Sequence, residues 1–171
     1  MNLFESLYLI CSSPEKKIGE MLRKHHLSVS SAESCTGGLI SSLLTDISGS
    51  SEYITENIIT YSNEAKRKYL NVKEETLDTF GAVSEQTAEE MAAGLKEQTK
   101  SDYTVVTTGI AGPTGGSKSK PVGLMYIGLA NKQNVQSIKV LAPEYLPRVI
   151  MKKVFAKKAL TELYKFVEKD I

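Results

Sequence analysis

The sequence predicts an α/β fold in which helices cover both faces of a mixed sheet. Segments with helical periodicity alternate with short strand-like segments, which is typical of a sheet layered between helices. Two late strand-like segments are separated only by Asn131–Asn134, and so short a connection favours an antiparallel hairpin. Because 171 residues are the length of one domain, we expect residues 1–171 to form a single domain.

The first clear element is a helix within residues 12–26. A serine is placed to cap it, Pro14 falls in its first turn, and apolar residues share one face. The residues before it have no decisive pattern. Leu27–Ala32 then alternates as a short strand. Apolar pairs recur at helical spacing over residues 39–44, and this second helix ends in the turn-forming segment Asp46–Ser51.

The middle of the chain predicts a strand and two helices. Asn57–Tyr61 is rich in β-branched and aromatic residues, which is typical of a strand. Asn63 is placed to cap the helix predicted over residues 64–70. Ser84 is placed to cap a further helix. The apolar side of that helix contains Ala88, Met91, Ala92 and Leu95.

The last third of the chain predicts three strands and a closing helix. Tyr103–Thr108 is typical of a buried strand, and the glycine-rich loop Gly109–Gly123 follows it. Leu124–Ala130 and Val135–Ala142 predict the two strands of the hairpin. The closing helix has one apolar stripe. That stripe contains Ala156, Leu160, Leu163, Tyr164 and Val167.

The composition argues against several classes of function. Twenty acidic residues nearly cancel 21 basic ones, so no net charge directs the chain to nucleic acid or an anionic membrane. Cys11 and Cys35 form no CxxC pair and fit a reducing compartment. His25 and His26 are adjacent and cannot share one helix face as a metal pair would need. We therefore expect a soluble cytoplasmic protein without a metal site, and no apolar run approaches membrane-spanning length.

The segment Ser31–Gly38, SAESCTGG, concentrates reactive side chains at the junction between the first strand and the helix after it. Ser34 and Cys35 are both candidate nucleophiles, because unpaired amides at a helix start stabilise a developing oxyanion. The alternative is structural, with Ser34 or Thr36 capping the helix and Cys35 buried. No histidine beyond the adjacent pair is available, which disfavours a histidine-based catalytic triad.

The segment Thr60–Lys66, TYSNEAK, supplies a candidate base. A lysine acts as a base when burial or a neighbouring cation lowers its pKa, and a tyrosine can hold a hydroxyl or relay its proton. Tyr61 ends a predicted strand and Lys66 begins the next helix, so the loop between them is able to bring both toward one point. The alternative is a tyrosine at a strand end and a solvated lysine.

The segment Gly112–Ser119, GPTGGSKS, comes within one residue of a phosphate-binding P-loop. A P-loop opens a helix at its lysine, whereas Pro121, Gly123 and a strand follow here, so the context disfavours nucleotide triphosphate hydrolysis. A flexible glycine loop after a buried strand can lay backbone amides along a phosphate or a carboxamide. The alternative is a surface turn.

Taken together, the motifs carry a resemblance to a known family. AESCTGG, GSS, TYSNEAK, GAVSE, TGIAGPTGG and KPVG, in this order and at these intervals, closely resemble the C-terminal domain of the CinA (competence/damage-inducible) family. The resemblance spans residues 18–160. It implies a three-layer α/β/α sandwich, a homodimer, and the stand-alone form without the amino-terminal domain of longer members. It also implies a nicotinamide-nucleotide amidase, which hydrolyses nicotinamide mononucleotide to nicotinic acid mononucleotide and ammonia with no cofactor and no metal.

The resemblance also implies roles for particular residues. Ser34 is the nucleophile, Lys66 accepts its proton, and Tyr61 positions or relays that proton. Amides of Thr36, Gly37 or Gly38 hold the oxyanion, and Arg148 is a partner for the phosphate. For Glu33 three roles stay open: it orients the site, it contacts the substrate, or it only interacts favourably with the helix dipole. The residues expected at the substrate are Glu33, Thr36, Gly37, Gly38, Asn63, Thr108, Gly109, Gly112, Gly115, Gly116 and Arg148.

The chain departs from the family pattern at three places. Asn57 stands where glycine is usual, Pro147 precedes Arg148 where an aspartate is usual, and Lys152 replaces a common arginine. Lysine lacks the planar fork of arginine, so these departures bear on phosphate contacts and substrate affinity more than on the serine chemistry. The competing class of function is a non-enzymatic regulatory or partner-binding protein of competence or the DNA-damage response.

Overall fold

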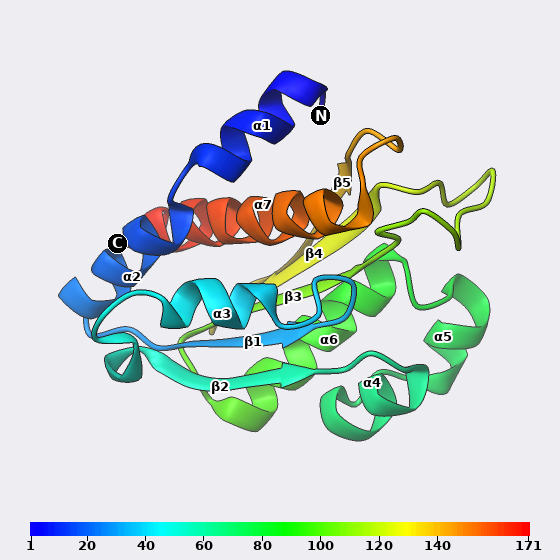
Figure 1. Ribbon diagram of the computed structural model, residues 1–171. Helices are drawn as coiled ribbons and strands as arrows, with labels where there is room; N and C mark the ends of the chain where they lie inside the picture. The colour runs from blue at the N-terminus through cyan, green and yellow to red at the C-terminus, as the bar shows by residue number, and fades with distance from the viewer.

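The computed structural model describes residues 1–171 and contains a five-stranded sheet between two layers of helices (Figure 1). The strand order is β2-β1-β3-β4-β5, in which β1 pairs in parallel with β2 and β3 while β4 and β5 run antiparallel. The predicted mixed sheet is therefore confirmed. The strands are β1 (Val29–Glu33), β2 (Ile54–Ile59), β3 (Tyr103–Gly109), β4 (Leu124–Ala130) and β5 (Val135–Leu141).

Two groups of helices cover the two faces of the sheet. In Figure 1, α2, α3 and α7 lie above it, with α1 beyond α7, and α4, α5 and α6 lie below. This is the predicted three-layer α/β/α arrangement. The helices are α1 (Leu3–Cys11), α2 (Pro14–Lys24), α3 (Leu39–Thr45), α4 (Asn63–Leu70), α5 (Glu74–Phe80), α6 (Glu85–Thr99) and α7 (Arg148–Glu168), with a short 3-10 turn at Ser50–Glu52.

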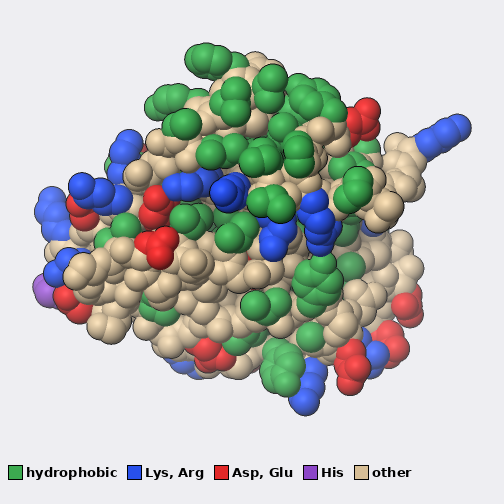
Figure 2. Space-filling view, in the orientation of Figure 1, with side chains coloured by type: hydrophobic (Ala, Val, Ile, Leu, Met, Phe, Trp, Pro, Cys, Tyr) green, Lys and Arg blue, Asp and Glu red, His purple; other side chains and the backbone are tan.

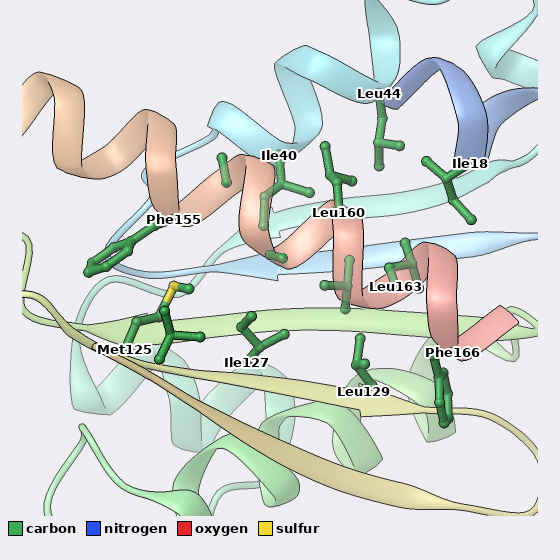
Figure 3. Close-up of a cluster of buried hydrophobic side chains, with 14 of the residues drawn as sticks. Ile18, Ile40, Leu44, Met125, Ile127, Leu129, Phe155, Leu160, Leu163 and Phe166 are labelled. Carbon is green, nitrogen blue, oxygen red and sulfur yellow. The ribbon is translucent and has the colours of Figure 1, made fainter. Parts of the chain in front are cut away.

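The core has two parts because successive residues of a strand point to opposite faces. Val105 joins the larger cluster beneath α7, whereas its neighbour Val106 joins the smaller cluster against α6. Figure 3 shows side chains of β4 and α7 meeting in the larger cluster. On the other face of β4, a Cβ at Gly128 would lie 2.2 Å from the carbonyl oxygen of Ala88, so α6 packs directly on the strand backbone.

The boundaries correct several sequence predictions. The strand predicted over Asn57–Tyr61 is β2, Ile54–Ile59, because its pairing with β1 ends where Glu33 faces Ile59. The predicted cap Asn63 is wrong: Ser62 accepts the N–H of Ala65, and Asn63 is the first residue of α4. The sequence analysis missed the short α5, which buries only two side chains, and left α1 undecided. The hairpin across residues 131–134 is confirmed.

Because β1, β2 and β3 are parallel, the three segments that follow them begin at the same edge of the sheet. β1 runs into Ser34, β2 into Thr60, and β3 into Ile110. In open α/β sheets, ligands bind in the crevice outside the carboxyl ends of the strands. None of the helices is both long and apolar enough to span a membrane.

Candidate active site

A pocket of about 270 Å³ opens at the carboxyl edge of the sheet, where the three chemically distinctive segments meet. Ser34 comes from the end of β1, Lys66 from α4, and Gly109 from the end of β3. Arg148, the first residue of α7, completes the wall. The remaining lining residues are Cys35, Tyr61, Ala82, Val83, Thr108, Ile110, Ala111, Gly112, Thr114 and Gly115.

Ser34 is held rigidly at the base of this pocket. Its N–H donates to the carbonyl of Thr107 at 3.1 Å, which continues the pairing of β1 with β3 by one residue. Its side chain is mostly buried. The hydroxyl oxygen accepts a hydrogen bond from Lys66 Nζ at 3.1 Å. The structure therefore brings together the serine and the lysine that the sequence analysis paired.

Lys66 is a buried lysine with an unusual environment. Only 1% of the residue is exposed, and Nζ also donates to the carbonyl of Thr60 at 2.8 Å and of Tyr61 at 3.5 Å. Burial lowers the pKa of Lys66 from 10.5 to about 8, because the charged ammonium loses its hydration. The alternative of a solvated lysine is thereby contradicted.

The three contacts of Lys66 suit a base. A neutral amine has two N–H donors and one lone pair, and two carbonyls are available to take the two donors. The lone pair is then free to accept the hydroxyl proton of Ser34 along the existing 3.1 Å contact. The backbone carbonyls of the loop between β2 and α4 thus orient the amine toward the serine oxygen.

Cys35 has the opposite character. It is buried in the larger core cluster, and burial raises the pKa of its thiol to about 12. The nucleophilic form of cysteine is the thiolate, so this thiol is protonated and unreactive near neutral pH. Of the two candidate nucleophiles, the structure favours Ser34.

Glu33 occupies a different place from the predicted substrate contact. It is fully buried, and its carboxylate accepts the N–H groups of Gly38 at 2.9 Å, Ile40 at 3.1 Å and Ser41 at 2.8 Å. The hydroxyl of Ser41 donates to it as well, at 2.7 Å. Glu33 therefore caps the start of α3 and lies outside the lining of the pocket.

The same contacts correct the predicted oxyanion donors. Since the N–H of Gly38 is bonded to Glu33, it is not available to an oxyanion. The turn amides of Cys35, Thr36 and Gly37 have no hydrogen-bond acceptor in the protein. The Thr36 side chain is buried and its hydroxyl pairs with that of Thr107 at 2.8 Å, so only its backbone is available to a ligand. Glu33 and the carbonyl of Gly38 take the N–H groups of Gly38, Ile40, Ser41 and Ser42, so the free amides next to Ser34 are those of the turn.

Tyr61 lines the pocket but does not touch the reactive pair through its phenol. The ring is exposed, and its hydroxyl accepts a hydrogen bond from Arg148 at 3.0 Å. Arg148 donates also to the carbonyl of Gly112 at 2.7 Å. The guanidinium therefore bridges two walls of the pocket. The structure contains no hydrogen bond from the phenol of Tyr61 to Ser34 or Lys66, so it offers no route for the predicted proton relay.

The other predicted substrate residues divide between the pocket and its surroundings. Thr108, Gly109, Gly112 and Gly115 line it, although the Thr108 hydroxyl is bonded to the carbonyl of Ala82. Asn63, Gly37 and Gly116 lie outside the lining. The sequence analysis missed Ala82, Val83, Ile110, Ala111 and Thr114, of which the first two belong to the GAVSE motif.

Lys152 lies close to the nucleophile turn. Its Nζ is 3.2 Å from the place where a Cβ on Gly37 would be, and Gly37 has a left-handed backbone with φ +61°. Arg148 and Lys152 are four residues apart on α7 and therefore share one face of that helix. The departure at Lys152 thus keeps a cation beside the turn.

The fold and the pocket define an α/β/α-sandwich protein with a buried serine–lysine pair at the carboxyl edge of its sheet. Within that class, the chain belongs to the CinA C-terminal domain family, whose model matches residues 12–167. The resemblance found in the sequence is therefore confirmed.

Individual relatives agree with this assignment. A CinA-like protein of Chloroherpeton thalassium is 55% identical over 132 residues, covering 77% of this chain and 31% of that protein. One from Chlorobium limicola is 46% identical over 160 residues, covering 92% of this chain and 37% of that protein. The chain thus spans about a third of the length of these relatives.

Solved structures agree in fold over most of the chain. The competence/damage inducible protein CihA of Agrobacterium tumefaciens has a TM-score of 0.86 and 40% identity, covering 90% of this chain and 95% of that one. A CinA-superfamily protein of Escherichia coli has a TM-score of 0.84 and 27% identity, covering 90% of this chain and 88% of that one.

Proposed function

We propose that this protein is a serine amidohydrolase that converts nicotinamide mononucleotide to nicotinic acid mononucleotide and ammonia. The observation that carries the proposal is the 3.1 Å contact between the Ser34 hydroxyl and the buried amine of Lys66, whose pKa is lowered to about 8. A lysine in this state removes a proton from a serine near neutral pH. The substrate is proposed from the family resemblance. A regulatory or partner-binding role has no need of a buried lysine at this position.

The proposed reaction has two halves. The Ser34 oxygen bonds to the carboxamide carbon while Lys66 accepts the hydroxyl proton, and the carbonyl electrons move to oxygen. Turn amides of Cys35 and Thr36 are the nearest unpaired donors along the chain to hold this oxyanion. The carbon–nitrogen bond then breaks, and ammonia leaves with the proton from Lys66.

The second half releases the acid. Water attacks the ester carbon as Lys66 accepts a proton from it, the bond to Ser34 breaks, and the serine oxygen takes that proton back. Overall one amide and one water give one acid and one ammonia. Tyr61 acts in this scheme through its contact with Arg148, at the mouth of the pocket, and not on the transferred proton.

The direct test is ammonia release from nicotinamide mononucleotide by the purified protein. We expect ammonia and nicotinic acid mononucleotide in equal amounts, detected by a coupled ammonia assay and by chromatography. Nicotinamide riboside at the same concentration tests whether the phosphate is needed, and free nicotinamide tests whether the ribose is needed as well. Absence of ammonia from the mononucleotide over the range pH 7–9 would exclude the proposed activity.

Arg148 is proposed to bind the substrate phosphate. Two of its five N–H donors are used by Tyr61 and Gly112, which leaves donors for a phosphate at the pocket mouth. We expect Arg148→Ala to raise KM for the mononucleotide about 10-fold, since a hydrogen bond to a charged group contributes on that scale. Activity on nicotinamide riboside should change little. Arg67→Ala, at an exposed arginine outside the pocket, is the control. An equal loss on both substrates would contradict a phosphate contact.

A homodimer is proposed as the assembled state. Apart from the resemblance, its support is the apolar surface over α1, where Leu3, Phe4, Leu7 and Tyr8 are exposed and gather at the top of the face in Figure 2. A groove of about 630 Å³ separates α1 from β5 and is lined mostly by apolar side chains. Large exposed apolar patches mark interfaces.

The mass in solution tests the proposed dimer. Light scattering should give twice the chain mass of 18.8 kDa, and Phe4→Glu should shift the protein toward monomer.

A further inference from the structure

Glu33 is a buried charge that the proposed chemistry does not use directly. The inference drawn from it rests on the proposed function. We propose that Glu33 is a positioning residue of the amidase: it fixes the turn Cys35–Gly38 so that the free amides of that turn meet the reacting carbonyl oxygen, without itself touching substrate.

The carboxylate of Glu33 is saturated with hydrogen bonds. Oε2 accepts the N–H groups of Gly38 and Ile40, and Oε1 accepts the N–H and the hydroxyl of Ser41. Each oxygen therefore accepts two hydrogen bonds. A carboxylate has acceptor sites for all four donors, whereas a side-chain amide has only one acceptor oxygen. A buried charge satisfied on both oxygens is rigid, because losing one partner leaves an unpaired polar group away from water.

The turn Cys35–Gly38 lies between two anchoring hydrogen bonds. At one end the N–H of Ser34 is bonded to Thr107 of β3, and at the other the N–H of Gly38 is bonded to Glu33. Gly37 and Gly38 have left-handed backbones with φ +61° and φ +95°, which glycine adopts without strain. Between these anchors lie the amides that have no acceptor. Glu33 thus takes the N–H groups of Gly38, Ile40 and Ser41 out of competition and leaves the turn donors next to Ser34 to the substrate.

A chain of polar contacts extends from Glu33 to the neighbouring strand β2. The hydroxyl of Ser41 lies 3.3 Å from that of Ser31, and Ser31 donates to Asn57 Oδ1 at 2.7 Å. Asn57 is one of the departures from the family pattern, and it lies outside the pocket lining. In this chain it supports the Glu33 network and does not contact the ligand.

The experiment compares Glu33→Gln with Glu15→Gln, each read by thermal unfolding and by steady-state kinetics on nicotinamide mononucleotide. Glu15 forms a largely buried ion pair with Lys157, away from the pocket, so its loss also costs stability. A glutamine at 33 offers one acceptor oxygen in place of two and misplaces the turn. We expect kcat of Glu33→Gln to fall about 10- to 100-fold, less than the roughly 100- to 1,000-fold loss on removing an oxyanion donor outright, while KM stays within about 3-fold. Glu15→Gln should keep the parent kcat well below its own unfolding temperature.

A second pair of variants covers the case in which Glu33→Gln does not fold. Ser41→Ala removes one hydrogen bond from the carboxylate, and Ser41→Thr restores the hydroxyl. We expect a lower kcat in the first and recovery in the second, at unchanged KM. Suppose that the parent protein is active. If Glu33→Gln and Ser41→Ala then both have the same kcat as the control Glu15→Gln, the positioning role is wrong but the amidase activity is not. If the parent itself releases no ammonia, the proposed function fails and the positioning role with it.

Discussion

Ser34→Ala is expected to lower kcat on nicotinamide mononucleotide by at least about 1,000-fold, because removing a nucleophile removes the covalent path altogether. Lys66 Nζ contacts the Ser34 hydroxyl and two backbone carbonyls, and of these three groups only the hydroxyl has a proton to donate. KM should change little, since the methyl group of alanine fits the space of the serine. The measurement is steady-state ammonia release, with circular dichroism to confirm the fold.

Cys35→Ala is the matched control for that result. Its thiol lies beside the nucleophile in sequence but in the core, with a pKa raised to about 12. We expect kcat of Cys35→Ala within about 3-fold of the parent and a stability loss of about 1 kcal/mol from the small cavity. If Cys35→Ala abolished turnover and Ser34→Ala did not, the nucleophile would be the cysteine.

Lys66→Met is expected to lower kcat by about 100- to 10,000-fold, the usual contribution of a general base. In the parent, kcat/KM should rise with pH and level off above about pH 8, where the Lys66 amine is neutral. The rise follows because burial lowers the pKa from 10.5 to about 8 and only the neutral amine accepts the Ser34 proton. A pH–rate profile from pH 6 to pH 9.5 measures it.

Two variants separate the base from other roles of the lysine. Lys66→Arg keeps a cation but cannot lose its proton, so it should be as inactive as Lys66→Met. Lys68→Met, on the exposed face of the same helix, should behave as the parent. Activity in Lys66→Arg would mean that the positive charge, and not proton transfer, is what the site needs.

The lowered pKa also predicts how stability depends on pH. Below about pH 8 Lys66 is charged in the folded and the unfolded chain, so the full cost of burying the charge is present. Between about pH 8 and 10.5 the folded protein releases this proton while the unfolded chain keeps it, so stability rises with pH. Urea titrations should show the parent gaining on the order of 3 kcal/mol relative to Lys66→Met across that window.

Much of the fold followed from local patterns. Strands β3, β4 and β5 were predicted close to their observed bounds, and the start of helix α6 was predicted from its cap Ser84. The end of β2 was misplaced because Thr60 and Tyr61 have strand propensity, whereas the ladder stops where β1 stops. Helix α5 was not predicted because only two of its seven residues are buried, which is too few to give a helical pattern of apolar residues.

The reactive residues of the site were predictable, whereas five of its lining residues and most of its contacts were not. Ser34 and Lys66 were candidates because their segments concentrate reactive side chains, and the family resemblance chose Ser34 over Cys35. Their contact follows because segments after parallel strands meet at one edge of the sheet. The bond between Tyr61 and Arg148 joins residues 87 positions apart, and no local signal encodes it. The role of Glu33 depends on a turn that brings residues five to eight positions later back to its carboxylate, and no sequence pattern marks this turn.

The bond from the Ser34 amide to Thr107 has a consequence for how the protein loses activity. It ties the reactive residue into the central ladder of the sheet, where amide protons exchange with solvent only when the whole domain opens. The contact of Arg148 with Tyr61 lies instead at the exposed rim, where opening is local and inexpensive. We therefore expect the proposed substrate to enter and leave by local opening of the rim, while Ser34 stays in place until the domain unfolds as a unit.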